Sequence, residues 1–167
     1  MRKIIILGTL HGLTPKEELQ KLLEQYHPDQ LLIEIKEEDL KTKKIENYPS
    51  EMIFTYAFAK ENNIEVKGFD AKVEGILKKE EKELIKKEGE IIKNLSWKEM
   101  NKKENQNKLR KVSKEFMDTK KEEERQYKML KNINKKMRKD KTIMILTGCG
   151  NLDFFKRHIK ESLLPLE

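Results

Sequence analysis

Hydrophobic positions along the chain follow two kinds of pattern. Four short runs are rich in apolar and β-branched residues, which predicts strands, and the run over residues 3–9 suits a strand buried on both faces. These predicted strands span residues 3–9, 30–35, 64–70 and 142–148. Between and after them, apolar residues recur every three or four positions, as in amphipathic helices. Helices are predicted to begin at Thr14-Pro15 and at Pro49-Ser50, and a last one covers Leu152 to Ile159.

The first 70 residues therefore alternate strand, helix, strand, helix, strand. Such an alternation predicts right-handed crossovers and a parallel sheet, because parallel neighbours need a long connection that a helix supplies. We expect an α/β fold with a mainly parallel sheet flanked by helices. A length of 167 residues suits one hydrophobic core, so residues 1–167 are predicted to form a single α/β domain.

Residues 71–140 differ from the rest in composition. They hold 23 Lys and Arg against 14 Asp and Glu, a net charge of +9, whereas the other residues together carry −2, so the basic character of the chain belongs to this segment. Three apolar stripes, around Leu84, Leu109 and Leu130, predict two or three amphipathic helices. This lysine- and glutamate-rich segment is interpreted as a helical insertion before the last strand, which could also support a homo-oligomer.

Several classes of protein are disfavoured by the same composition. The lysines are interleaved with glutamates and few aromatics, which does not favour nucleic-acid binding. Cys149 is the only cysteine, so an internal disulfide is excluded. The apolar start lacks a small-residue cleavage site, and no apolar run approaches the length of a membrane span. We expect a cytoplasmic protein.

Polar residues gather at the ends of the predicted strands. His11 follows the first strand, Glu34 lies near the end of the second, Asp70 ends the third and Asn151 follows the fourth. Ligands of open parallel sheets bind beyond the carboxyl ends of the strands, so these residues are predicted to share one crevice. Asp70 and Asn151 also suit a second interpretation, as N-caps of the helices that follow them.

Glu34 needs a partner because it lies within the apolar sequence "LLIEI". A buried carboxylate costs several kcal/mol unless it is paired, protonated or bound to metal. His11, Arg125 or a divalent cation could compensate it. A histidine with one or two carboxylates is a reasonable ligand set for a first-row metal. Common motifs of metallopeptidases, nucleophilic hydrolases and phosphate loops do not occur in the sequence.

An ordered set of short motifs resembles the TraB/PrgY family, which includes the GumN-like proteins and the Tiki proteases and is related to the erythromycin-esterase and ChaN group. The motifs are "GTLH" (8–11), "PDQLLIEI" (28–35), "SEMIFTYAFAKENNIEVKGFD" (50–70), "ERQYKM" (124–129) and "IMILTGCGNLDFFKRHI" (143–159). The resemblance covers the chain except for roughly residues 72–120.

The resemblance implies a metal-dependent hydrolase fold, with peptidase activity in the Tiki branch. The family carries two GxxH motifs with a glutamate and an arginine between them. His11 matches the first histidine, Glu34 and Glu51 match glutamates of the family, and Arg125 matches the arginine. The second motif is broken, because Asn151 stands where the second histidine would be. Glu51 also suits a purely structural role in the first turn of a helix.

Three hypotheses follow. In the first, the protein is a divergent metal-dependent hydrolase acting on a peptide or small molecule. His11, Glu34 and Asn151 would hold Mn, Co or Zn, with Glu34 or Glu51 as general base and Arg125 stabilising the oxyanion. In the second, a non-catalytic binding protein keeps the cleft but has lost a metal ligand. In the third, the basic helical insertion is an interaction module.

Overall fold

Five parallel strands form one sheet in the computed structural model, which describes residues 3–166. The strands lie in the order β3-β2-β4-β1-β5. Their bounds are β1 (Lys3–Thr9), β2 (Gln30–Ile33), β3 (Glu65–Gly68), β4 (Thr142–Gly148) and β5 (Ser162–Leu163). The predicted α/β fold with a parallel sheet is confirmed. The second and third strands are shorter than predicted, and the two-residue β5 was not predicted.

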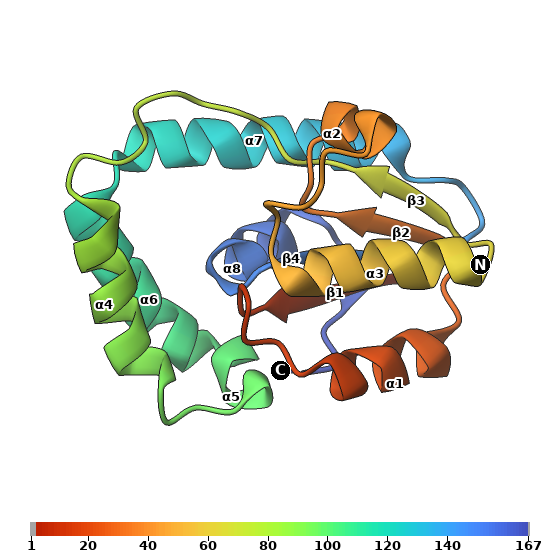
Figure 1. Cartoon of the computed structure of the whole chain (residues 1–167), viewed down its shortest axis with the longest axis horizontal. Helices are drawn as coiled ribbons and strands as arrows, with labels where there is room; N and C mark the ends of the chain where they lie inside the picture. Colours follow the sequence, from red (N-terminus) through yellow and green to blue (C-terminus); the bar gives the residue numbers. More distant parts are fainter. Residues whose placement is uncertain (1–2, 167) are drawn as a thin grey trace.

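Helices cover both faces of the sheet (Figure 1). One face packs against α1 (Lys16–Tyr26) and α3 (Ser50–Glu61), through apolar side chains that include Leu19 and Met52. The other face packs against α7 (Thr119–Lys136) and α8 (Cys149–His158), through side chains that include Ile133 and Phe155. A short helix, α2 (Glu37–Thr42), which was not predicted, follows β2.

The central strands are apolar throughout because both of their faces are covered. In β1, Ile5 and Leu7 belong to the cluster under α1 and α3, whereas Ile4 and Ile6 belong to the cluster under α7 and α8. Side chains of a strand alternate between its two faces, so an unbroken apolar run satisfies both clusters. The runs that identified the strands in the sequence therefore report burial on both sides.

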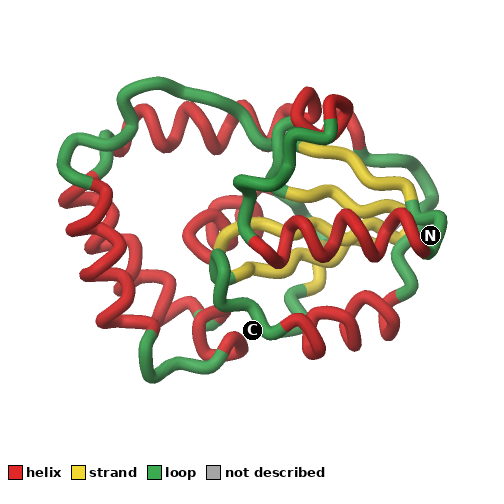
Figure 2. The backbone as a smooth tube through the Cα atoms, viewed as in Figure 1, coloured by secondary structure: helices red, strands yellow, loops and turns green. Residues whose placement is uncertain are grey.

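The segment 71–140 contains four helices rather than the predicted two or three. They are α4 (Glu81–Ile92), α5 (Trp97–Asn101), α6 (Lys103–Phe116) and α7. In Figure 2, α4 and α6 extend away from the sheet, whereas α7 returns along it. Helix α5 contacts β1, because Trp97 and Asn101 bond to Gly8. The chain that leads into α4 is attached to the connection between α6 and α7 by an antiparallel bridge between Leu77 and Met117. None of the helices between residues 3 and 166 is long and apolar enough to span a membrane.

The helix starts differ in detail from the predictions. Helix α1 begins at Lys16 with Pro15 in the N-cap position, and the hydroxyl group of Thr14 instead bonds to the backbone of Leu10. Helix α3 begins at Ser50 itself. The side chain of Thr14 therefore closes the turn that carries His11 and does not cap the helix.

Burial predicts a clear contrast between two identical substitutions. I145A removes a fully buried side chain between the sheet and α7 and α8, and should lower the free energy of unfolding by about 2–5 kcal/mol. I85A truncates a side chain on α4 that is 60% exposed, and should change it by less than about 0.5 kcal/mol. Urea unfolding followed by circular dichroism measures both. Equal losses would contradict the assignment of the core.

Candidate functional site

The carboxyl ends of β1 to β4 bring the predicted site residues to one edge of the sheet. His11 lies in the turn after β1, Glu34 directly follows β2, and Asp70 lies two residues beyond β3. Asn151 lies in the first turn of α8, directly after β4. Glu34, Asp70, Arg125 and Asn151 join in one hydrogen-bonded network, and His11 forms a separate pair with Glu51.

Glu34 is the centre of the network, and its side chain is only 6% exposed. One carboxylate oxygen accepts hydrogen bonds from the Thr147 hydroxyl group and from the backbone N–H of Gly148 at 2.8 Å. The other accepts a bond from the Arg125 guanidinium at 3.2 Å, and the Asn151 amide lies 3.2 and 3.3 Å from the two oxygens. The partner that the sequence required for Glu34 is therefore Arg125, together with three neutral donors.

Arg125 joins two carboxylates that would otherwise repel each other. Its Nη2 atom lies 2.6 Å from Asp70 Oδ1 and 3.2 Å from Glu34 Oε1, and its Nε atom donates to the carbonyl oxygen of Ala71 at 3.1 Å. Burial and the neighbouring Glu34 raise the pKa of Asp70, although Arg125 opposes this shift. The backbone N–H of Ala71 also bonds to Asp70, but no helix follows, so the prediction that Asp70 caps a helix is wrong.

Asn151 bridges Glu34 to α7. Its amide nitrogen faces Glu34, and its amide oxygen accepts a hydrogen bond from Gln126 at 3.0 Å. The alternative prediction, that Asn151 caps the last helix, is wrong because α8 starts two residues earlier with Gly148 in the N-cap position. The side chain thus presents a donor where the resemblance implies a metal-binding histidine.

His11 is oriented by Glu51. The Nδ1 atom of His11 lies 3.0 Å from Glu51 Oε1, and the other oxygen of Glu51 accepts the backbone N–H of Gly12 at 2.9 Å. The Glu51 side chain is fully buried in the first turn of α3, whereas that of His11 is 52% exposed. One carboxylate therefore holds both the His11 ring and the turn that carries it. The Nε2 atom of His11 takes no part in these two contacts.

The two pKa values in this pair shift in opposite directions. Burial lowers the pKa of His11, but the hydrogen bond to Glu51 and the charges of Glu34 and Glu51 outweigh it, and the pKa lies above 6.5. Burial raises the pKa of Glu51, but the bonds to His11 and to the Gly12 N–H outweigh it, and the pKa lies below 4.5. The pair is therefore stabilised in its charged form.

The ring of His11 lies directly over Gly148. A Cβ atom added to Gly148 would stand 2.9 Å from His11 Nε2 and 3.2 Å from Cε1, closer than such contacts normally allow. A side chain at this position would displace the ring or the turn. Because Gly148 has no side chain, the Nε2 atom of His11 can lie beside the start of α8.

The expected metal ligands do not form a ligand set as they are arranged. Both oxygens of Glu34 face hydrogen-bond donors, the Asn151 oxygen is taken by Gln126, and the guanidinium of Arg125 places a positive charge beside Glu34. Within residues 3–166, no group of three or more His, Cys, Asp or Glu side chains is placed to hold a metal ion. The residues present do not fit Mn, Co or Zn, and the metal implied by the resemblance stays a prediction.

Four residues near the site were not singled out in the sequence. Thr147 and Gln126 complete the network around Glu34, and both lie within the quoted motifs, at 143–159 and 124–129. Glu88 of α4 and Glu122 of α7 interact electrostatically with each other, and Glu88 also interacts with His11. Burial raises the pKa of both. Nothing in the sequence distinguishes these two glutamates from the other glutamates of the segment 71–140.

Cys149 lies beside the site but is not arranged as a nucleophile. The residue is 4% exposed, and burial raises the pKa of its thiol to about 12. Since the thiolate is the reactive form, this environment disfavours nucleophilic attack at neutral pH.

Comparison with known proteins found no relative: no protein-family model, curated protein or solved structure matches the chain. The resemblance to the TraB/PrgY family therefore remains a prediction from the motifs. The candidate site is defined by the geometry of its own residues.

Removal of the Arg125 charge should expose the cost of burying Glu34. R125M leaves two carboxylates without their cation and should lower the free energy of unfolding by about 3–5 kcal/mol. R138M is the matched control, because Arg138 is 60% exposed and pairs with Glu65 at the surface; its effect should stay below about 1 kcal/mol. Urea unfolding at neutral pH compares them, and equal effects would contradict the central role of Arg125.

The pKa shifts of His11 and Glu51 predict how E51Q changes stability with pH. The contribution of Glu51 is present above 4.5 and is lost as the pH falls through its lowered pKa. The contribution of His11 is present below 6.5 and is lost as the pH rises through its raised pKa. The difference in unfolding free energy between wild type and E51Q should therefore be largest between pH 4.5 and 6.5.

Urea titrations at a series of pH values measure that difference. E61Q, at the exposed far end of α3, is the control and should leave the pH profile of the wild type unchanged. A difference between wild type and E51Q that does not vary with pH would show that the charged pair does not form.

Proposed function

We propose that this protein is a hydrolase in which His11 acts as the general base. The observation that supports this most is the hydrogen bond between Glu51 and His11 Nδ1, which leaves Nε2 beside Gly148 at the edge of the sheet. A carboxylate in this position fixes the tautomer and orientation of an imidazole and stabilises its protonated form. The substrate class is a peptide or a small molecule with a hydrolysable carbonyl group.

In the proposed mechanism, His11 Nε2 takes a proton from a water molecule that attacks the carbonyl carbon. The proton that Glu51 holds on Nδ1 stays there, and the positive charge that forms on the ring is stabilised by Glu51 and by the nearby Glu34. His11 then returns the proton to the leaving group. The first turn of α8, which begins beside Gly148, provides the positive end of a helix dipole for the developing oxyanion.

Arg125 has a different part from the one expected. Its guanidinium donates to Glu34, Asp70 and the Ala71 carbonyl, so its hydrogen bonds are committed within the protein. We assign it to holding the two carboxylates in place, and Glu51 to positioning His11. His11 is then the one residue to which the mechanism gives a proton-transfer step with the substrate.

A non-catalytic binding protein is the second candidate function. The donors around Glu34 favour it, because Thr147, Gly148, Asn151 and Arg125 satisfy the carboxylate without any ligand. A protein that had lost its second metal ligand could retain such a network for structural reasons and still bind a ligand in the cleft. Hydrolysis and binding without turnover are distinguishable by experiment.

The test is a hydrolysis assay on a panel of peptides and activated esters, with H11A compared with wild type. Loss of a general base should lower kcat/KM by about 10²–10⁴-fold. H27A is the matched control, since His27 lies at the end of α1 away from this edge of the sheet, and it should keep wild-type activity. Near-UV circular dichroism of both variants confirms that they are folded.

Metal content is measured in the same preparations. The mechanism above predicts activity that survives extensive dialysis against a chelator. If wild type instead retains Mn, Co or Zn by elemental analysis, and H11A loses both the ion and the activity, the metal-dependent form of the hydrolase is correct. If no substrate is turned over but ligands raise the melting temperature of wild type and not of H11A, the binding protein is correct.

A further inference from the structure

The outer edge of β1 changes partner halfway along the strand. Strand β5 pairs with β1 only at Ile4 and Ile5, whereas β4 pairs with it from Lys3 to Thr9. Beyond the reach of β5, the backbone N–H and C=O of Gly8 need other partners, because a buried peptide group without one is unfavourable. Gly8 lies three residues before His11.

Asn101 supplies these partners from the helical insertion. Its Oδ1 atom accepts the backbone N–H of Gly8 at 3.0 Å, and its Nδ2 atom donates to the Gly8 carbonyl oxygen at 2.8 Å. A carboxamide carries the same donor and acceptor as a peptide group, so the side chain takes the place of one residue of a neighbouring strand. Trp97, one turn earlier in α5, donates to the same carbonyl oxygen at 2.6 Å.

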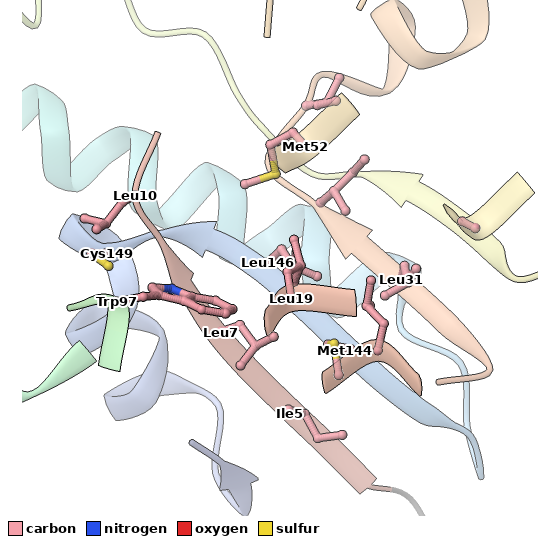
Figure 3. Close-up of a cluster of buried hydrophobic side chains, with 14 of the residues drawn as sticks. Ile5, Leu7, Leu10, Leu19, Leu31, Met52, Trp97, Met144, Leu146 and Cys149 are labelled. Atoms are coloured by element: carbon pink, nitrogen blue, oxygen red, sulfur yellow. The ribbon is translucent and has the colours of Figure 1, made fainter. Parts of the chain in front are cut away.

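This contact is buried and closely packed. Asn101 is 2% exposed and Trp97 3% exposed. Figure 3 shows the Trp97 indole lying along β1 beside Leu7, with Cys149 and Leu10 close by. A Cβ atom on Gly8 would stand 2.8 Å from Asn101 Oδ1 and 3.2 Å from Cys149 Sγ, so only glycine allows the carboxamide to approach this closely.

Asn101 is itself held in place by the helices around it. Its Nδ2 atom also donates to the Trp97 carbonyl oxygen at 3.1 Å, and its own carbonyl oxygen accepts a bond from Gln106 at 2.7 Å. Ser96 and Glu99 begin α5 with a reciprocal capping box. The carboxamide therefore lies on a built support rather than on a free side chain.

The turn that follows Gly8 and carries His11 is also held by several hydrogen bonds. The Thr9 hydroxyl donates to the Thr147 carbonyl oxygen, and both backbone groups of Leu10 bond to the Thr14 hydroxyl. Gly12 adopts a left-handed conformation with φ of 75°. A displacement of Gly8 thus carries through a stiff turn to His11, whose ring must meet Glu51 on one side and clear Gly148 on the other.

From these contacts we infer that Asn101 is a positioning residue for His11, so that the helical insertion fixes the geometry of the candidate site from outside the sheet. The inference rests on the proposed function in taking His11 as the functional histidine. It predicts that loss of the Asn101 carboxamide separates His11 from Glu51, although Asn101 contacts neither residue's side chain directly.

The experiment uses NMR, without a substrate, to measure both the contact of Gly8 with Asn101 and the contact of His11 with Glu51. Amide hydrogen exchange of Gly8, in protein labelled at its seven glycines, reports the contact with Asn101. The ¹⁵N shifts of the three histidine rings, at a pH where His11 is neutral, report its tautomer. Wild-type His11 should carry its proton on Nδ1, facing Glu51, and E51A marks the spectrum without that contact.

In N101A, the exchange of the Gly8 amide should be at least about tenfold faster, and the His11 tautomer should move toward that of E51A. N105A is the matched control. Asn105 is buried in the same segment and bonds to the Glu99 carbonyl oxygen, so its loss removes a similar contact without touching Gly8. It should leave both signals as in wild type.

If N101A does not fold, N101D replaces it, because aspartate has nearly the same shape but cannot donate to the Gly8 carbonyl oxygen. A wild-type His11 tautomer in folded N101A or N101D, with or without faster exchange of Gly8, overturns the inference. An equal change in N105A overturns it as well. Failure of the proposed function would look different: wild type would turn over no substrate while both NMR signals behave as described.

Discussion

The buried carboxylate of Glu34 is the constraint on which the rest of this structure depends. A charge that is 6% exposed is costly unless donors surround it. Those donors come from the end of β4, the first turn of α8 and the middle of α7. Strand β2 therefore cannot occupy its place without three other elements in theirs, and Arg125 extends the same requirement to Asp70 after β3.

Much of this arrangement could be predicted from the sequence. Short apolar runs indicated β1, β2 and β4, because these inner strands are covered on both faces. The edge strand β3 is interrupted by Glu65 and Lys67 and was found from its place in the alternation of strands and helices. Polar residues at the ends of parallel strands necessarily meet at one edge, which brought Glu34, Asp70 and Asn151 into one group. Arg125 was among the candidates for Glu34 because a buried carboxylate in an apolar run demands a cation.

Which of these site residues contact one another could not be predicted from the sequence. The sequence does not give the strand order, and the order decides that Glu34 on β2 meets Thr147 and Gly148 on the adjacent β4. Nor does it show that Glu51 faces His11, because an acidic residue in the first turn of a helix is common for electrostatic reasons alone. Asn151 suited a helix cap equally well, and only the observed start of α8 excludes that role.

The segment 71–140 was the least predictable part, because its amphipathic stripes resemble those of many exposed helices. Its apolar residues indicated helices, but not that α7 would cover a face of the sheet or that α5 would reach the backbone of β1. Such contacts depend on single polar groups, such as the Asn101 carboxamide, in a segment where asparagines are frequent. The segment is thus part of the fold's support rather than an addition to it.

The central position of β4 also has a consequence for how the chain reaches this state. Strand β4 lies between β1 and β2, and its pairing joins Lys3 to Thr142. The middle of the sheet is therefore absent until Gly148 has been synthesised, and β1 and β2 are not neighbours in the finished sheet. Contacts so distant in sequence slow folding and leave apolar strand edges open to association.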